Sequence, residues 1–303
     1  MNKKSHPLLE DTCLPFQIEG QDIKGRIVRL GHSVNEILSS HNYPNQISKL
    51  MGEVLAFTAL IGSLMKYDGI LTTQMKGDGP FRVLISDFHK ENKKLNGNIR
   101  GYASFDDIMK EGDSLQNMFG EDAYLAITID QGSFMERYQG IVKLEGDTIT
   151  HAAEEYFRSS EQLPTKIILA CDQDEHGIWQ ACAIMIQHYA RSAEGEYVRD
   201  ETKTKEDWNN SSILLNTIKK VELLDKKLSL QNLLIRLYNE AGVRVFDHTE
   251  VTANCRCSED KIRTVLSSLD LKELKDVSED GTVTVTCDFC KIDHKFELSK
   301  LID

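Results

Sequence analysis

The stretch "CRCSEDKIRTVLSSLDLKELKDVSEDGTVTVTCDFC", residues 255–290, carries a pair of cysteines at each end. Cys255 and Cys257 are separated by one residue, and Cys287 and Cys290 are separated by two. In a reducing compartment such short paired spacings predict metal ligands or redox-active thiols rather than a framework of structural disulfides. The stretch therefore leaves three alternatives, which are a structural metal site, a catalytic dithiol and a thiol switch.

The segment between the two pairs carries its own helix and strand signals. Ser258 is a favourable N-cap, and Glu259 and Asp260 lie in the first turn, where the helix dipole favours negative charge. Residues at helical spacing are predicted to face inward, namely Ile262, Val265, Leu266 and Leu269. "TVTVT", residues 282–286, predicts a strand. The tail from 251 to 303 is too short for a core of normal stability without a metal or a crosslink.

The four cysteines predict one tetrahedral zinc site. In an extended segment Cys255 and Cys257 share a face, and a tight turn brings Cys287 and Cys290 together. Four thiolates are a ligand set that suits zinc, and a structural zinc ribbon is the simplest interpretation. Zinc nevertheless keeps the sulfurs as thiolates, the form that oxidants attack. Both pairs are also close enough in sequence to form local disulfides, Cys255–Cys257 and Cys287–Cys290, once the metal leaves.

Loss of zinc is expected to unfold the tail, because a domain this small draws much of its folding free energy from its metal. That free energy is about 10–16 kcal/mol in zinc-finger peptides at neutral pH. A thioredoxin-like enzyme is a third interpretation of "CDFC", but there the motif opens a helix in a βαβ unit, whereas here it follows "TVTVT". His294 is a further candidate ligand, although with four thiols present a surface role is simpler.

Residues 1–190 predict an α+β domain with a mostly antiparallel sheet. The segment from Pro44 to Gly69 repeats apolar residues at helical spacing and predicts a long, mostly buried helix. "THAAEEYFRSSEQ" predicts a further helix. Short runs bounded by turn residues predict strands, namely "ILTTQM", "FRVLIS", "NIRGYAS", "YLAITI", "YQGIVK", "TKIILAC" and "IWQACAIMI".

The composition changes at residues 191–212, "RSAEGEYVRDETKTKEDWNNSS", whose charge is typical of an exposed linker. Two short amphipathic patterns follow, one with Ile213, Leu214, Ile218 and Val221, the other with Leu230, Leu233, Leu234 and Leu237. Helices this short are unstable alone and need a surface to cover. We therefore predict a core domain at 1–190, a charged and then helical linker at 191–250, and a zinc-binding domain at 251–303.

Charge and hydropathy exclude several classes of partner for this chain of 303 residues. The net charge of −12 disfavours sequence-independent binding to nucleic acid. The longest apolar run, from Val54 to Met65, is shorter than the about 20 residues that span a bilayer, so no membrane partner is predicted. The first residues, "MNKKSHPLLEDTCLPF", lack the apolar run of a signal peptide. These features predict a cytoplasmic protein.

No motif in the chain predicts an enzyme. "GDGP", at Gly77–Pro80, lacks the lysine and hydroxyl of a phosphate-binding loop and is simpler as a fixed turn. "SSEQ", with Ser160 and Glu161, has no accompanying catalytic constellation, so a helix-end or packing role is predicted. The remaining cysteines lie beside apolar residues and are predicted to be inert buried or half-buried thiols, namely Cys13, Cys171 and Cys182.

The paired cysteines occur together with several longer motifs. These include "GDGP", "RGY" at Arg100–Tyr102 and "YFRSSEQLPT" at Tyr156–Thr165, and "HNYPNQISKLMGEVLAFTALIGSLMKYDG", "TIDQGSFMERYQGIVKLEG" and "IQHYA" add to them. With this combination the chain resembles the redox-regulated heat-shock chaperones of the thirty-three-kilodalton class. The resemblance runs from about Pro15 to the C-terminus.

The resemblance implies a holdase that keeps unfolding client proteins soluble without ATP. In that family the reduced, zinc-loaded form is largely inactive, and oxidation forms two disulfides, releases zinc, unfolds the tail and linker, and exposes apolar surface, often with homodimer formation. By position, the zinc ligands and redox thiols are Cys255, Cys257, Cys287 and Cys290, with the second pair sensing oxidant first. Two alternatives remain, which are a zinc ribbon that binds nucleic acid or ribosomes, and a thiol oxidoreductase that uses Cys287 and Cys290.

Overall fold

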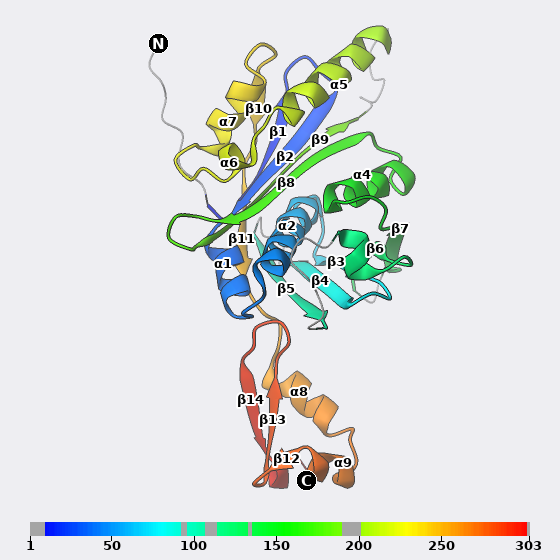
Figure 1. Cartoon of the computed structure of the whole chain (residues 1–303), viewed down its shortest axis with the longest axis vertical. Helices are drawn as coiled ribbons and strands as arrows, with labels where there is room; N and C mark the ends of the chain where they lie inside the picture. The colour runs from blue at the N-terminus through cyan, green and yellow to red at the C-terminus, as the bar shows by residue number, and fades with distance from the viewer. Residues whose placement is uncertain (1–9, 92–95, 107–113, 133–134, 190–200, 302–303) are drawn as a thin grey trace.

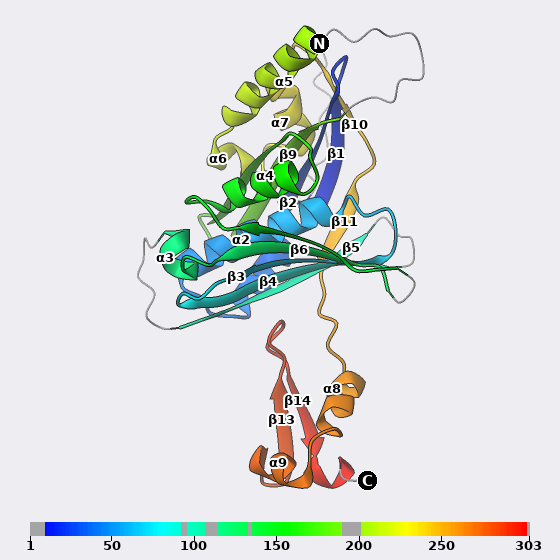
Figure 2. The same ribbon diagram turned by 90° about the vertical axis from the view of Figure 1, so that its right-hand side faces the viewer.

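The computed structural model describes residues 10–91, 96–106, 114–132, 135–189 and 201–301. Figures 1 and 2 show a large body built of a curled sheet with helices, and a small body below it that is formed by the tail. An extended chain after β11 joins the two bodies (Figure 2). This architecture confirms the predicted α+β class with a mostly antiparallel N-terminal sheet, a helical linker and a small cysteine-bearing C-terminal unit.

Among the described residues the large sheet has eleven strands, in the order β7-β6-β3-β4-β5-β11-β1-β2-β9-β8, with β10 also pairing with β1. The pairs are antiparallel except for β5 with β11. The strands are β1 Thr12–Ile18, β2 Ile23–Leu30, β3 Gly69–Lys76, β4 Phe81–Lys90, β5 Gly97–Phe105, β6 Tyr124–Asp130, β7 Tyr138–Lys143, β8 Thr165–Gln173, β9 Trp179–His188, β10 Val243–Val245 and β11 Thr249–Ala253.

The seven strands predicted between 69 and 188 are all present, whereas β1, β2 and the helix α1 (His32–Ser39) were not predicted. Lys24, Arg26 and Arg29 interrupt the apolar run of β2, and Pro15 and Gly25 disfavour a strand. These strands form because both of their faces are covered in the folded protein, which local pattern does not reveal.

The predicted long helix is α2, Asn45–Gly62, which packs against β2, β3, β4, β5, β8 and β9. It begins directly after Pro44 and is buried along most of its length. Gly62 permits close approach, since a Cβ there would lie 2.3 Å from the ring of Phe88. The helix therefore forms the centre of the main core. Two shorter helices, α3 Leu115–Phe119 and α4 Ile149–Ser159, also contribute buried side chains to this core.

The predicted amphipathic segments form α5 Glu201–Asn216, α6 Lys220–Leu223 and α7 Leu230–Leu237. We call residues 201–241 the linker helices. They cover the face of β1, β2, β8 and β9 that points away from α2 (Figure 1). The sheet contributes Leu14, Phe16, Ile18, Ile23, Ile27, Ala170, Cys182, Ile184 and Ile186, and the linker helices contribute Leu215, Ile218, Leu223, Leu230, Leu233, Leu234 and Tyr238. The short helices thus have the apolar surface that they need. The first predicted pattern was wrong in part, because Ile213, Leu214 and Val221 are exposed and Leu215 and Leu223 are buried in their place.

The charged segment predicted as an exposed linker is helical from Glu201 onward. This part is the beginning of α5, whose first three turns are mostly solvent-exposed, while residues 191–200 lie outside the described residues. The helix forms because its C-terminal turn, with Ser211 and Leu215 buried, is held against the sheet. Charge alone therefore indicated exposure correctly but not the helix.

The tail contains α8 Glu259–Leu266, α9 Leu271–Asp276 and a three-stranded sheet of β12 Ser278–Glu279, β13 Thr282–Thr286 and β14 Asp293–Glu297, followed by a 3-10 turn at Leu298–Lys300. Its small core consists of Leu266, Leu274, Val283, Phe296 and Leu301. Ser258 caps α8, as predicted, by accepting a hydrogen bond from the amide of Lys261.

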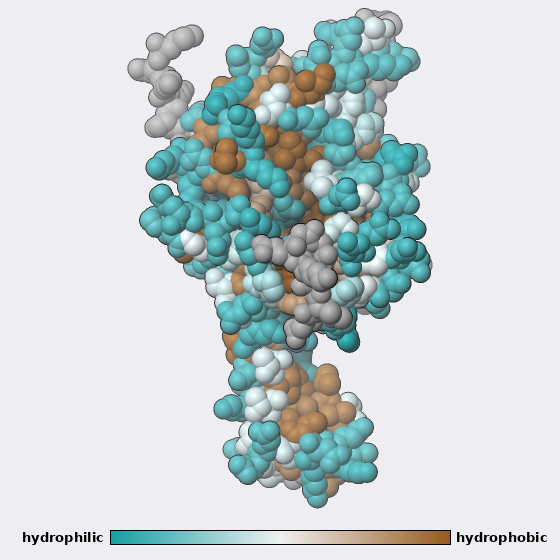
Figure 3. All heavy atoms as spheres, in the orientation of Figure 1, coloured by the Kyte–Doolittle hydropathy of each residue, from teal (hydrophilic) through white to brown (hydrophobic). Residues whose placement is uncertain are grey.

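Two of the predicted inward-facing residues of the tail are in fact exposed. Val265 is 64% exposed and Leu269 is 36% exposed, because the core of this unit reaches only the stripe of α8 that carries Ile262 and Leu266. Figure 3 shows apolar side chains gathered on the tail over α8. The helical spacing was right, but the small core has room for only part of the stripe.

The predicted boundary between linker and tail falls inside a strand. Both β10 and β11 pair with β1, and β11 spans residues 249–253, across the predicted boundary at 250/251. The backbone of Thr249–Ala253 thus belongs to the large sheet, and the division into three domains stays a prediction. Among the described residues, no helix is long and apolar enough to cross a membrane.

Candidate metal centre

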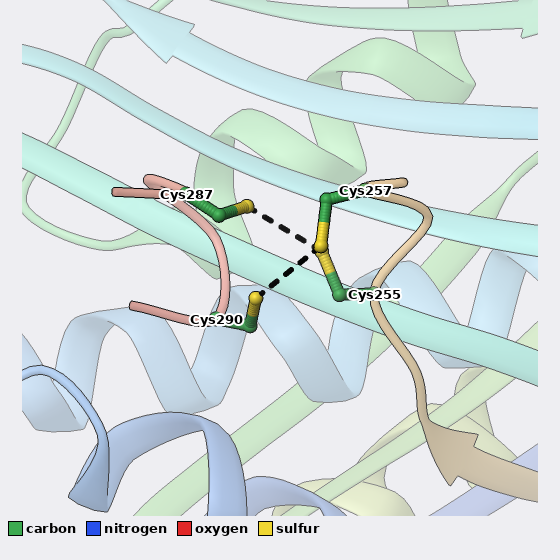
Figure 4. Close-up of side chains that lie close together, drawn as sticks. All are labelled: Cys255, Cys257, Cys287 and Cys290. Carbon is green, nitrogen blue, oxygen red and sulfur yellow. Dashed lines mark hydrogen bonds between the residues drawn. The ribbon is translucent and has the colours of Figure 1, made fainter. Parts of the chain in front are cut away.

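Four cysteine side chains from two separate segments converge at one point (Figure 4). Cys255 and Cys257 lie in the loop that follows β11, and Cys287 and Cys290 lie in the turn between β13 and β14. The turn is closed by main-chain hydrogen bonds, from the Cys287 amide to the Ile292 carbonyl (3.0 Å) and from the Lys291 amide to the Cys287 carbonyl (2.8 Å). The hairpin therefore presents both of its sulfurs to the loop.

The distances between the sulfurs fit the ligands of one tetrahedral ion. The Sγ atoms of Cys255 and Cys287 are 3.7 Å apart, and those of Cys257 and Cys290 are 3.6 Å apart. All four lie within 4.8 Å of one another. A tetrahedron with zinc–sulfur bonds of about 2.3 Å has sulfur–sulfur edges of about 3.8 Å. His294 is not a member of this group, which agrees with the preference for four thiols.

The surroundings make Cys255 more acidic than two of its neighbours. Burial raises its pKa, but hydrogen bonds with Cys257, Cys287 and Arg100 outweigh this effect and lower the pKa to about 7. Burial raises the pKa values of Cys257 and Cys290, and hydrogen bonding with the other thiols adds to the rise for Cys257. Negative charge is therefore favoured on Cys255, whose sulfur accepts a hydrogen bond from Arg100.

A carboxylate of the large sheet attaches the thiol cluster to the main body. Asp87 on β4 is buried and accepts hydrogen bonds from Arg100 (2.9 and 2.7 Å) and from Arg256 (2.9 Å), the residue between the first two cysteines. Thr72 donates to its other oxygen at 2.7 Å. Arg100 also donates to the sulfur of Cys255 at 3.9 Å. Such charge-assisted pairs in a half-buried site are strong and directional.

The second cysteine pair rests on the same part of the sheet. The guanidinium of Arg100 lies 3.8 Å over the ring of Phe289, and Tyr102 meets the same ring edge to face, at 4.7 Å between centroids. The carbonyl of Asp288 is 2.9 Å from Nε2 of His41. In the sequence, Arg100 and Tyr102 stand out only as part of the "RGY" motif. Their contact with the thiol centre depends on tertiary structure, and no local signal indicated it.

The hairpin position of "CDFC" bears on the oxidoreductase alternative. Cys287 and Cys290 occupy a turn between two antiparallel strands, not the first turn of a helix. The field of a helix N-terminus, which lowers the pKa of an attacking cysteine in thioredoxin-like proteins, is therefore not supplied here. The geometry favours a shared ligand role.

The other three cysteines are not members of the thiol cluster. Cys13, Cys171 and Cys182 are buried, which confirms the prediction for them. Burial raises all three pKa values, that of Cys182 to about 12, although Arg29 opposes the rise for Cys182. They are protonated at neutral pH and unreactive.

The two motifs assigned to packing have the expected structural roles. "GDGP" is the turn between β3 and β4, and the amide of Gly79 donates to the carbonyl of Phe119 at 2.8 Å. A Cβ at Gly77 would collide with the same carbonyl, so the loop backbone is held against α3. Glu161 accepts hydrogen bonds from the hydroxyl groups of Tyr138 and Tyr156 and fixes the end of α4.

Comparison with known proteins gives one consistent result. The model of the Hsp33 protein family matches residues 11–297. The chain is 38% identical over 301 residues to the 33 kDa chaperonin of Caulobacter vibrioides (strain NA1000 / CB15N), with 96% of each chain covered. It is 32% identical over 293 residues to that of Shewanella sediminis, covering 95% of this chain and 93% of the relative.

The fold is similar to a crystal structure, that of the 33 kDa chaperonin (heat shock protein 33 homolog) of Thermotoga maritima. The TM-score is 0.77 at 20% identity, with 96% of both chains covered. The match of the family model over nearly the whole described chain, together with relatives above 30% identity, shows the family. The chain belongs to the Hsp33 family.

Proposed function

We propose that this protein is an ATP-independent chaperone, a holdase that oxidation switches on. The observation that carries the proposal is the thiol cluster, whose sulfur spacing suits one zinc ion and which lies only a few residues beyond β11. The relatives named 33 kDa chaperonin support the chaperone part. The clients are unfolding proteins, the compartment is the cytoplasm, and the oxidised form is a homodimer.

The zinc ligands of the reduced protein are Cys255, Cys257, Cys287 and Cys290. A bound zinc ion would hold the four sulfurs as thiolates and would stabilise the tail. In the oxidative step a thiolate attacks a peroxide oxygen and becomes a sulfenic acid as one water leaves. The second thiol of the pair then displaces a second water and closes the disulfide. Two peroxides thus oxidise four thiols to the disulfides Cys255–Cys257 and Cys287–Cys290 and yield four waters.

Disulfide sulfurs are poor ligands, so the oxidised tail loses its metal and the fold that depended on it. The Arg256–Asp87 contact and the Phe289 contact then release from β4 and β5. In the chain, β11 lies between the linker helices and Cys255. Release of the tail therefore loosens β11, and the linker helices lose the attachment at their C-terminal end. These helices bury one apolar sheet face, so their departure exposes the side chains of Leu14, Phe16 and their neighbours to clients.

The test follows metal, thiols and protection in one sample. The purified reduced protein is exposed to peroxide at two temperatures while zinc release, free thiols and light scattering of an unfolding test protein are recorded. We expect about one zinc to leave as four thiols disappear, with protection appearing in step. Cys171→Ser is the matched control, because it removes a thiol outside the cluster and leaves the response unchanged.

Two outcomes would refute the proposal. If zinc stays bound during oxidation, or if it leaves without any gain in protection, the cluster is only a structural site. Salt-dependent binding of nucleic acid would instead support the zinc-ribbon alternative, and catalytic turnover of a disulfide substrate would support the oxidoreductase alternative. A holdase acts in stoichiometric amounts, so the dependence of protection on protein concentration separates it from a catalyst.

A further inference from the structure

One arginine lies buried in the apolar face that the linker helices cover. Arg29 is 1% exposed and belongs to β2, where the alternation of side chains places it on the same face as Ile23 and Ile27. Most of the other buried side chains of this face in the sheet are apolar, and Thr12, which pairs with Arg29 across β1 and β2, is a buried polar exception without charge. A guanidinium in such surroundings is costly unless hydrogen bonds or an opposite charge compensate it. Arg29 therefore needs specific partners.

Those partners are main-chain carbonyls of the linker helices. Nη1 of Arg29 donates to the carbonyl of Leu228 at 2.8 Å, and Nη2 donates to that of Leu223 at 2.9 Å. Cys182 is the neighbour of Arg29 across the β2–β9 pair. In the part of the chain that the structure describes, no carboxylate forms an ion pair with Arg29, and its Nε has no hydrogen-bond partner.

Both carbonyls lie outside the hydrogen-bond ladder of a helix. Leu223 is the last residue of α6, and Leu228 directly precedes Ser229, the N-cap of α7. The last carbonyls of a helix have no intrahelical donor and need an external one. Arg29 supplies that donor for Leu223 and also binds the carbonyl of Leu228 in the loop beyond α6, so it recognises main-chain carbonyls rather than any particular side chain.

The docked linker thus shows what kind of polypeptide this face accepts. It is a segment that buries leucines, such as Leu230 and Leu234, from short amphipathic helices and offers free carbonyls between them. Apolar side chains and main-chain carbonyls occur in every unfolding protein, so the same chemistry suits many sequences. An extended segment presents its carbonyls differently from a helix end, because they point sideways toward neighbouring strands.

We infer that Arg29 is a specificity-determining residue of the client surface, and that this surface takes short amphipathic helical segments with free carbonyls at a helix end and in the loop beyond it. The inference rests on the proposed function, since it assigns a second occupant to the face that the linker helices leave on oxidation. The guanidinium then donates to the client's carbonyls as it donates to those of Leu223 and Leu228 in the docked state. Partly folded clients are bound in preference to fully extended ones.

The test uses the oxidised full-length protein and a fluorescent peptide of residues 213–241 of this same chain, with binding followed by anisotropy. Arg29→Met is expected to weaken peptide binding about tenfold or more, the loss that one charge-assisted hydrogen bond produces. Arg29→Lys keeps the charge but not the forked donors, so its affinity is expected to be intermediate. Arg158→Met, an exposed arginine on α4, is the matched control and leaves the affinity unchanged.

A second peptide separates helical from extended recognition. Substitution Ile235→Pro keeps the buried leucines but prevents α7 from forming, and it is expected to abolish binding. Equal affinity of the two peptides for the wild-type protein would overturn the inference, as would Arg29→Met affinity within twofold of wild type. If Arg29→Met does not fold, the Arg29→Lys variant provides the test. Peptide affinity of Arg29→Lys equal to that of the wild type would also overturn the inference.

This experiment fails independently of the proposed function. A wild-type protein that binds the peptide after oxidation but does not suppress aggregation refutes the holdase and leaves the role of Arg29 in place. A wild-type protein that suppresses aggregation while the Arg29 variants bind as tightly as wild type refutes only the role of Arg29.

Discussion

The substitution Leu234→Ala should detach the linker helices from the sheet without touching a thiol. Leu234 is 0% exposed and lies in the cluster between α7 and the face of β1, β2 and β9. Truncation of a buried leucine costs about 2–5 kcal/mol, because transfer free energy is lost and a cavity remains. At about 3 kcal/mol, and with tenfold in an equilibrium constant for each 1.4 kcal/mol, the detached fraction rises on the order of 100-fold.

Hydrogen exchange on the reduced, zinc-loaded protein measures this change directly. Amides of α7 are expected to exchange on the order of 100-fold faster than in the wild type, whereas amides of α2, which belongs to the other core, keep their rates. Ile235→Ala is the matched control on the same helix, since Ile235 is 47% exposed and its loss leaves no cavity. Light scattering on the same samples should show protection without oxidant only for Leu234→Ala.

The reasoning would be refuted by α7 amides that exchange within about threefold of the wild-type rate. It would also be refuted by faster exchange without any protection of a test protein. The first result would mean that the linker helices are held by something other than this apolar cluster, and the second that the face below them is not the client surface.

Three further predictions concern the tail, the main core and the turn between β8 and β9. Arg256→Gln removes one of the two cations from Asp87, so amides of the tail near the cysteines are expected to exchange about tenfold faster in the reduced protein, as hydrogen exchange will show. Gly62→Ala places a Cβ 2.3 Å from a ring atom of Phe88, and this overpacking is expected to cost about 1–3 kcal/mol of unfolding free energy in denaturant titrations. Asp174 accepts hydrogen bonds from the Ile178 amide and from Lys226, and these lower its pKa from 3.8 to about 2. Its contribution is therefore complete above pH 3.8 and is lost as the pH falls toward 2, so Asp174→Asn should reduce the melting temperature at pH 7 but not at pH 2.

Much of the site could be predicted from the sequence because its determinants are local. Thiol spacing indicated one shared tetrahedral site for Cys255, Cys257, Cys287 and Cys290, and the sulfurs do converge. Ser258 was correctly predicted as a helix cap, since a cap depends on the next three residues only. Such features are set within a few residues along the chain.

What the sequence did not predict depends on contacts between distant segments. Arg256 and Asp87 are 169 positions apart, so nothing near either of them indicates the pair. Arg29 in β2 looks like a surface charge until α6 and the residues after it lie above it. The inward direction predicted for Val265 was wrong because the size of the tail core, not the helical pattern, decides which positions are covered.

Strand β11 has a consequence for the order in which the protein folds during synthesis. It lies between β5 and β1 and is the only connection, among the described strands, between the two halves of the large sheet. Pairing of β1 with β11 joins residues more than 200 positions apart, for example Thr12 with Glu250. The halves can form as each leaves the ribosome, but their closure must wait for the last fifth of the chain. A nascent chain paused before residue 249 thus has the edge of β5 and the Thr12–Cys13 part of the β1 edge open, and closing them is the final slow step of its folding.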